Sequence, residues 1–281
     1  MQLYLAGADS SGDHEPLMGM DGIGFLCSYF YIKNARGWRV VNYANENNIP
    51  VFLDSGAFSA FNIGAEIDTQ EYIQFCKEHK SKFANIAYLD AIGNEDKSLE
   101  NYKTMLDSGI DGIPTFHAGG SIDSFYKLFE LWDYIAIGGL VPYLSAHTGQ
   151  AYKQSVIRLL IQTHTAAKNE NKKLHGFGVT TWNLMKSFPW HSVDSSTWIS
   201  GRKFGRAMTF DGKKLGSVIA REKPQKVSET LRIIKSTKTV NDIIPKRNQG
   251  TGAYFDILRM NAEVMYFAVE KLNNVKSNSN H

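Results

Sequence analysis

The feature of this sequence that most constrains its fold is a repeated alternation of short apolar runs and helical patterns. Apolar runs at 51–53, 85–89, 112–116 and 134–137 each lead into glycine or a polar side chain, and a segment with helical spacing follows. The unit recurs roughly every thirty residues, which is the length of a strand with its crossover helix. The sequence therefore predicts an α/β fold built on a parallel sheet.

The chain has 281 residues, and α/β barrels commonly fold as single domains of about 250 residues. No G-x-G-x-x-G motif follows the first predicted strand at 3–6, as it would in an open dinucleotide-binding sheet. We therefore expect one (β/α)8 TIM-barrel domain over residues 1–272, with its C-terminal helix at 253–272. The aromatic stretch 25–32 fits a strand or a helix, and helix is favoured. Residues 273–281 are polar and predict a disordered tail.

Composition narrows the possible partners and compartments. The net charge is only +3, so a polyanionic partner has to be bound by a local patch. The two cysteines, Cys27 and Cys76, stand far apart, which predicts neither a disulfide framework nor a thiolate zinc site and favours a reducing compartment. The N-terminus has no signal-peptide pattern and no segment approaches eighteen apolar residues. A cytoplasmic protein without a membrane span is expected.

Residues with functional groups or exposed backbone that follow five predicted strands form the candidate site. They are Asp54, Asp90, His117, Gly139 and Asp194, and in a barrel the C-terminal ends of the strands lie at one edge. Each Asp taken alone also fits a turn or helix cap. Taken together, neighbouring carboxylates repel one another and become unequally protonated, which suits one as nucleophile and another as proton carrier.

Paired carboxylates are typical of retaining glycosidases. No zinc-ligand cluster, nucleophile elbow or P-loop in the sequence competes for this role. His117, His175 and His191 match no ligand spacing, so we expect no metal, and the last two are expected to be structural. Basic residues concentrate over 202–226, a pattern that usually marks a solvated face. The candidates there for binding phosphates are Arg202, Lys203 and Arg206.

The order of these motifs resembles the tRNA-guanine transglycosylase family, whose barrel exchanges a guanine for a 7-deazaguanine base. Residues 51–58, Val-Phe-Leu-Asp-Ser-Gly-Ala-Phe, resemble a family strand that ends in Asp-Ser-Gly-Gly-Phe. The resemblance implies that Asp54 is the acid/base carboxyl and that Phe58 stacks on the base. The spacing after the loop at 175–180, which resembles the family's Gly-Val-Gly-Thr loop, places Asp194 at the family's nucleophile.

The resemblance also implies which groups bind the base. Asp90 falls where the family has an Asp that reads the guanine edge. Gly138 and Gly139 match a Gly-Gly-Leu loop whose backbone touches the base, and Gly178 belongs to the loop at 175–180. Arg202 and Arg206 fall near the family's basic loop.

Three departures from the family pattern bear on specificity. The usual Val-Gln-Gly-Gly loop is Phe-His-Ala-Gly-Gly at 116–120, so His117 replaces a base-reading amide. The C-terminal Cys-x-Cys-x-x-Cys…His zinc site is missing, and the chain is shorter than typical bacterial members. A compact, zinc-free chain is similar to the phage and genomic-island branch, which places 7-deazaguanines such as 7-cyano-7-deazaguanine into DNA.

The resemblance therefore implies exchange of guanine in DNA for a free 7-deazaguanine base, through a covalent sugar–Asp194 intermediate and without a cofactor. A homodimer is compatible with it. Three alternatives stay open: the same exchange on tRNA, a nucleoside or glycoside hydrolase that uses the same carboxylates, and a catalytically silent barrel that only binds nucleic acid.

Overall fold

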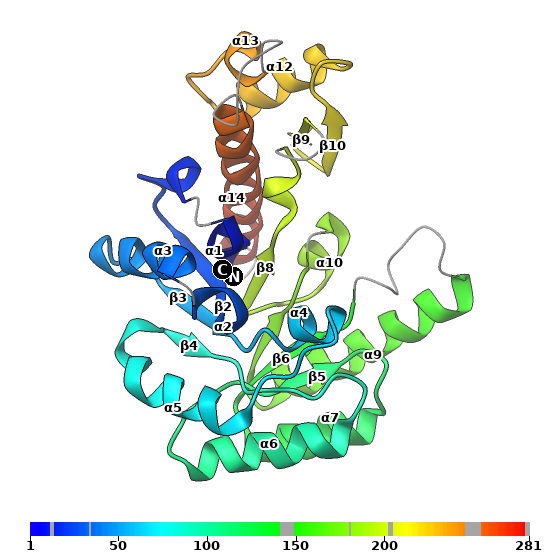
Figure 1. Ribbon diagram of the computed structural model, residues 1–281. Coiled ribbons are helices and arrows are strands. Elements are labelled where there is room, and N and C mark those ends of the chain that lie inside the picture. Colours follow the sequence, from blue (N-terminus) through cyan, green and yellow to red (C-terminus); the bar gives the residue numbers. More distant parts are fainter. Residues whose placement is uncertain are drawn as a thin grey trace.

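The computed structural model describes residues 1–11, 14–33, 35–140, 149–179, 181–201, 205–244 and 254–278. Within these ranges the chain forms an eight-stranded, all-parallel sheet with helices around it, and a separate two-stranded sheet (Figure 1). The large sheet contains β1 (Gln2–Ala6), β2 (Ile23–Ser28), β3 (Val51–Asp54), β4 (Asn85–Ile86), β5 (Thr115–His117), β6 (Tyr134–Gly138), β7 (Lys173–Gly176) and β8 (Ser192–Ser195). The predicted parallel α/β sheet is thereby confirmed.

The strand order is β4-β3-β2-β1-β8-β7-β6-β5, so consecutive strands are neighbours and β8 lies beside β1. In the β1–β8 register, Tyr4 lies opposite Asp194. Between the outer strands β4 and β5 the described contact is a single parallel bridge, Ala87 to Ile113, in which the Ile113 N–H donates to the Ile86 carbonyl at 2.8 Å. The sheet is curled, and its ladder is not continuous across this junction.

Side chains fill the concave side of the curled sheet. Tyr4 packs edge-on against Phe52 with ring centroids 5.5 Å apart, and its hydroxyl accepts a hydrogen bond from the Asn85 amide at 2.9 Å. Gly24 permits this arrangement, because a Cβ there would lie 2.4 Å from the Tyr4 ring. The buried apolar members of this interior cluster come from β1, β2, β3 and β6 and from the bridge between β4 and β5. They are Tyr4, Leu26, Phe52, Ala87, Ile113 and Ala136. The interior is therefore a packed core.

Helices follow the strands and cover the outside of the sheet (Figure 1). Side-chain caps fix where three of them begin: Asp68 accepts from the Glu71 N–H, Asn94 from the Lys97 N–H, and Ser121 from the Ser124 N–H. The α-helices of the sheet layer are α1 (Ala8–Ser11), α2 (Tyr29–Ile32), α3 (Ala35–Glu46), α4 (Ala57–Asn62), α5 (Thr69–His79), α6 (Glu95–Asp107), α7 (Ile122–Leu131), α9 (Gln150–Asn169) and α10 (Trp182–Ser187); short 3-10 turns are η1 (Glu15–Leu17), η2 (Lys80–Lys82) and η3 (Thr197–Ile199).

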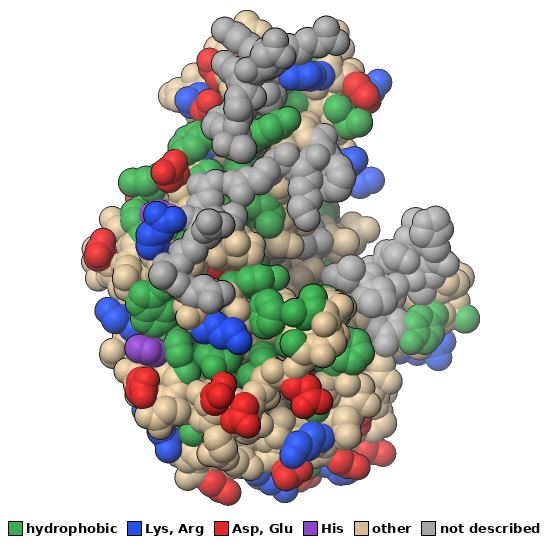
Figure 2. All heavy atoms as spheres, viewed as in Figure 1, with side chains coloured by type: hydrophobic (Ala, Val, Ile, Leu, Met, Phe, Trp, Pro, Cys, Tyr) green, Lys and Arg blue, Asp and Glu red, His purple; other side chains and the backbone are tan. Residues whose placement is uncertain are grey.

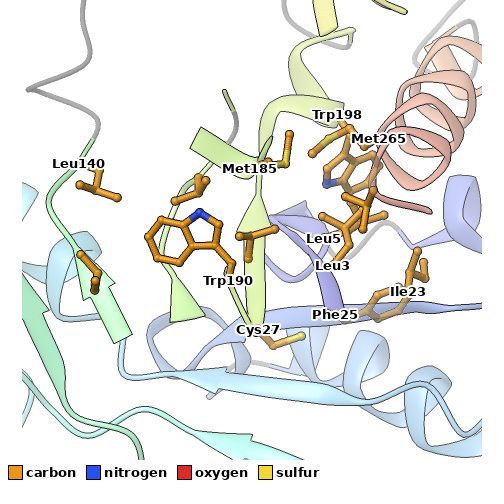
Figure 3. Packing of buried hydrophobic residues seen from close by; sticks show 14 of the residues in the cluster. Leu3, Leu5, Ile23, Phe25, Cys27, Leu140, Met185, Trp190, Trp198 and Met265 are labelled. Carbon is orange, nitrogen blue, oxygen red and sulfur yellow. The ribbon is translucent and has the colours of Figure 1, made fainter. Parts of the chain in front are cut away.

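The last quarter of the chain adds a small lobe at one end of the molecule (Figure 1). It consists of the antiparallel hairpin β9 (Arg206–Phe210) and β10 (Leu215–Ile219), then α12 (Pro224–Ile233) and α13 (Val240–Ile243), and α14 (Phe255–Asn278) runs from it back to the sheet. Figure 3 shows Trp198, Leu5 and Met265 packed where η3, β1 and α14 meet. Asn261 of α14 accepts from the Met208 N–H of β9 at 2.6 Å.

Two predicted elements have different bounds in the structure. The stretch 25–32 is not one helix, because β2 runs to Ser28 and α2 begins at Tyr29. The final helix, predicted to end at 272, continues to Asn278, so the start of the predicted disordered tail is helical, while residues 279–281 lie outside the described part. In the described part of the chain no helix combines the length and the apolar character needed to span a bilayer.

Candidate active site

The structure places the predicted site residues that follow the strands of the large sheet at one edge of that sheet. Asp54, His117 and Gly138 are the last residues of β3, β5 and β6, and Asp194 lies in β8 next to its C-terminal end. Asp90 follows β4. Because all these strands are parallel, their C-terminal ends lie on the same side. Side chains that are far apart in sequence therefore converge there.

Asp54 is the residue whose chemistry is most altered by this convergence. Burial, together with the carboxyls of Asp90 and Asp194, raises the pKa of Asp54 from 3.8 to about 7. Its Oδ2 accepts a hydrogen bond from the Gly56 N–H at 3.0 Å. Gly56 has φ 80°, and a Cβ there would lie 2.5 Å from the Ser28 hydroxyl, so the turn requires glycine. A carboxyl that titrates near neutral pH suits proton transfer.

Asp194 is buried and is contacted by residues of β7 and of the loop that follows β7. Only 6% of its surface is exposed, and its Oδ1 accepts a hydrogen bond from the Gly178 N–H at 2.8 Å. His175 Nε2 lies 3.3 Å from the same oxygen. The other ring nitrogen of His175 pairs with Ser192 Oγ at 2.6 Å, and Ser192 Oγ pairs with the Tyr134 hydroxyl at 2.5 Å. The Gly178 hydrogen bond orients Oδ1 of Asp194, and the imidazole of His175 packs beside that oxygen.

Asp90 and His117 form a pair beside Asp54. His117 Nε2 lies 2.7 Å from Asp90 Oδ2, and Ser55 Oγ donates to Asp90 Oδ1 at 3.3 Å. The imidazole rests against two glycines, because Cβ atoms at Gly138 and Gly139 would lie 3.4 and 3.6 Å from His117 Nδ1. The pair places hydrogen-bonding groups from two neighbouring strand ends side by side.

Two hollows flank the Asp90 loop, and both are lined in part by Ala91. One, of about 420 Å³, is lined by apolar side chains such as Leu99, Phe116 and Leu128 and by polar residues and glycines that include His117, Gly120, Lys127 and Gly139. The other, of about 630 Å³, is lined by residues that include Phe61, Leu89, Asp90, Lys97 and Asn101. His117, Gly139 and Asp90 thus border open space, whereas Asp54 and Asp194 line neither hollow.

Phe58 lies on α4, which begins one residue after Gly56. The ring is 66% exposed, and its neighbour Phe61 is 59% exposed. Figure 2 shows hydrophobic side chains gathered in the middle of this face, around the position of α4 in Figure 1. An exposed aromatic ring four residues after Asp54 is available for stacking.

The predicted basic candidates are only partly described. Arg206 begins β9, and its guanidinium donates to Ser217 Oγ on β10 at 2.8 Å. Arg202 and Lys203 lie outside the described residues. Across the described ranges, no group of three or more His, Cys, Asp or Glu side chains is placed to hold a metal ion.

Comparison with known proteins does not identify a family. No model of a known protein family matches the chain, and no curated protein matches it. The function is therefore inferred from the site residues and from the motifs in the sequence.

The structure also brings two residues to the site that the sequence interpretation did not assign to it. Asp9, which follows β1, is 3% exposed and accepts a hydrogen bond from the Ser28 N–H at 2.6 Å. His175, expected to be structural, contacts Asp194 directly. Asp9 follows an apolar strand just as Asp54 does, and that shared pattern was the signal available in the sequence.

Proposed function

We propose that the protein is a base-exchange glycosyltransferase, which replaces guanine in DNA with a free 7-deazaguanine base. The observation that carries the proposal is the grouping of Asp54 and Asp194 at one edge of a parallel sheet, with the pKa of Asp54 raised to about 7. One carboxyl can then carry a proton while the other acts as nucleophile. The motif order that resembles the tRNA-guanine transglycosylase family supplies the reaction class.

We also infer a (β/α)8 barrel as the complete fold. The consecutive strand order, with β8 beside β1, is the order of such a barrel. The bridge between Ala87 and Ile113 lies where β4 and β5 would close it. Active sites of these barrels lie at the C-terminal edge of the strands, which is where the carboxyls converge.

In the first half-reaction, the target deoxyguanosine leaves the base stack so that its C1′ reaches the carboxyls. Because Gly178 and His175 both contact Oδ1 of Asp194, we assign the attack to Oδ2. The bond from C1′ to N9 breaks as the bond from C1′ to Oδ2 forms. Asp54 enters this step protonated and gives its proton to the departing guanine.

In the second half-reaction, the 7-deazaguanine base gives its N9 proton to the Asp54 carboxylate. N9 then attacks C1′ and displaces Asp194 as a free carboxylate. Asp54 ends protonated and Asp194 ionised, as at the start. The cycle therefore balances without an oxidant, a reductant or a metal-bound nucleophile.

Base recognition is assigned to the groups around the Asp90 loop. His117, oriented by its 2.7 Å contact with Asp90, and the backbone of Gly138 and Gly139 face the edge of the base, while Phe58 stacks on its plane. The adjoining cavity of about 420 Å³ falls within the size range of small-molecule sites.

DNA is the favoured polymer, because the compact, zinc-free motif set is similar to the DNA-modifying branch, and tRNA is the alternative. Arg202, Lys203 and Arg206 are assigned to phosphate contacts, which are the main source of affinity for nucleic acids. Both cysteines are unpaired thiols, consistent with the proposal that the protein works in the cytoplasm.

Labelled guanine tests the proposal directly. The protein is incubated with guanine-containing DNA or with tRNA plus the labelled base, and incorporation into each polymer is measured. We expect incorporation into DNA that is abolished by Asp194→Asn and by Asp54→Asn. Asp21→Asn, an exposed carboxyl ahead of β2, is the matched control. Release of guanine without incorporation indicates a hydrolase, and neither event on either polymer contradicts the proposal.

A further inference from the structure

Asp9 is a buried carboxyl beside the site that the proposed reaction does not use. It lies in α1, directly after β1, at the same edge of the sheet as Asp54 and Asp194. Only 3% of its surface is exposed, and burial raises its pKa to about 6. A carboxyl that is buried yet ionised over much of the neutral range costs free energy, and such groups concentrate at functional sites.

Ser28 connects Asp9 to Asp54. Asp9 Oδ2 accepts the Ser28 N–H at 2.6 Å, and Ser28 lies opposite Asp54 in the β2–β3 register. The Ser28 hydroxyl is buried, and no hydrogen-bond partner for it exists among the described residues. It lies so close to Gly56 that a Cβ there would be 2.5 Å away, and the Gly56 N–H donates to Asp54. Asp9 therefore anchors the strand end against which the Asp54 turn rests.

We propose that Asp9 is a positioning residue of this site. It holds Ser28 and, through it, the Gly56 turn that orients Asp54, and it adds a further carboxyl to this edge of the sheet. This inference rests on the proposed function only where base exchange is the assay. The contacts of Asp9 and the titration of Asp54 do not depend on it.

The charged groups around Asp54 determine the direction in which its pKa should change when Asp9 is replaced. In the described part of the chain Asp54 faces the carboxyls of Asp90 and Asp194 as well as Asp9, and all three raise its pKa. Tyr72 of α5 is the other titratable side chain coupled to it, and burial raises the pKa of Tyr72 so that it stays neutral. Removing the charge of Asp9 therefore lets Asp54 lose its proton at lower pH.

The surroundings of Asp9 itself contain no compensating buried cation among the described residues. Cys27 of β2 faces it, and the Asp9 charge adds to burial in raising the pKa of that thiol. The charged residues of α3, which packs on α1, include Arg39 and Glu46, and both are exposed. His14 follows α1 and stacks on an aromatic ring of α3, with centroids 4.4 Å apart. Among the described carboxyls, Asp54 is the one whose pKa the charge of Asp9 raises.

Two substitutions separate the two parts of the role. Asp9→Asn keeps an oxygen that accepts the Ser28 N–H but removes the charge, and Asp9→Ala removes both. The titration of Asp54 is followed by NMR in protein labelled with ¹³C at the Asp carboxyl carbons, with the Asp54 signal assigned from Asp54→Asn. The pH dependence of base exchange is measured on the same proteins, with Asp21→Asn as the control and cooperative thermal unfolding as the test of folding.

We expect the Asp54 midpoint to move to lower pH in Asp9→Asn, and the corresponding limb of the exchange profile to move with it. Asp9→Ala should in addition lower kcat by roughly tenfold with little change in KM, because orientation of the proton carrier is lost. If Asp9→Ala does not fold, Asp9→Asn decides. An Asp54 titration in Asp9→Asn that coincides with the wild type overturns the inference. A shifted titration in a protein that exchanges no base contradicts the proposed function alone, because the NMR readout needs no substrate.

Discussion

Replacing Asp54 by Asn is expected to stabilise the folded protein above neutral pH while removing its activity. In the folded state the pKa of Asp54 is raised from 3.8 to about 7 by burial and by the carboxyls of Asp90 and Asp194. The folded protein therefore holds a proton that the unfolded chain has already released over this interval. The contribution of Asp54 to the free energy of unfolding is fully present below pH 3.8 and is lost as the pH rises towards 7.

The size of the effect follows from the shift. A difference of about three pH units, at 1.36 kcal/mol per unit, corresponds to about 4 kcal/mol over the full interval. A measurement between pH 5 and pH 8 covers only the last two or so of these pH units, so about 3 kcal/mol of the change falls within the measured range. Asn at position 54 has no proton to lose and can still accept the Gly56 N–H bond, so the variant should not share this loss.

The assay is urea denaturation of the wild type and of Asp54→Asn at several pH values from 5 to 8. The difference in unfolding free energy, variant minus wild type, should grow by roughly 3 kcal/mol over this range and then level off above pH 7. Contributions from other titrating groups, including Asp9, largely cancel in the difference. Asp21→Asn, which removes an exposed carboxyl, should give a nearly constant difference.

A difference that stays constant between pH 5 and pH 8 would refute this reasoning. It would mean that Asp54 is ionised in the folded protein throughout, and the carboxyl could not then serve as the proton donor at neutral pH.

Three further predictions concern base exchange. His175→Phe, which keeps a ring in the core but loses the contact with Asp194, should lower kcat by roughly tenfold or more with KM little changed, as measured in steady-state kinetics. His117→Gln should change the ratio of kcat/KM between guanine and 7-deazaguanine bases in a competition assay, and an unchanged ratio would remove His117 from base reading. Phe58→Ala should weaken binding of single-stranded DNA by roughly 1 to 3 kcal/mol in a fluorescence titration, whereas Phe61→Ala, which is similarly exposed, should bind like the wild type.

Much of the fold was predictable because its signals are local. An apolar run followed by a polar residue and a helical pattern is contained within one stretch of sequence, so β3 and its Asp54 could be located. β2 could not, since residues 25–28 lead directly into α2 and the glycine that marks the strand, Gly24, is needed only because the ring of Tyr4 packs on it. Such a contact between two strands leaves no local pattern.

The C-terminal lobe was missed for a related reason. Its hairpin is tied to α14 by Asn261, which accepts from the Met208 N–H and donates to the Trp198 and Arg206 carbonyls. These partners lie more than fifty residues away in the sequence. A buried Asn that joins three segments is indistinguishable, in sequence, from any polar residue on a helix.

The candidate site shows the same limit. Convergence of Asp54 and Asp194 followed from the parallel topology alone. The contact between His175 and Asp194 depends on the β7–β8 register, and the role of Asp9 depends on its distance to Ser28. A carboxyl in a Ser-rich loop has the composition of an ordinary turn, so only its position in space separates the two interpretations.

The most direct test of the central claim is to trap the sugar–enzyme bond. The protein is mixed with a guanine-containing oligonucleotide without a second base, the reaction is stopped with acid, and the covalent adduct is mapped by peptide mass spectrometry. We predict an adduct on the peptide that contains Asp194, and on that residue within it, with none in Asp194→Asn. An adduct on a different residue, or base exchange at the wild-type rate by Asp194→Asn, would contradict the account.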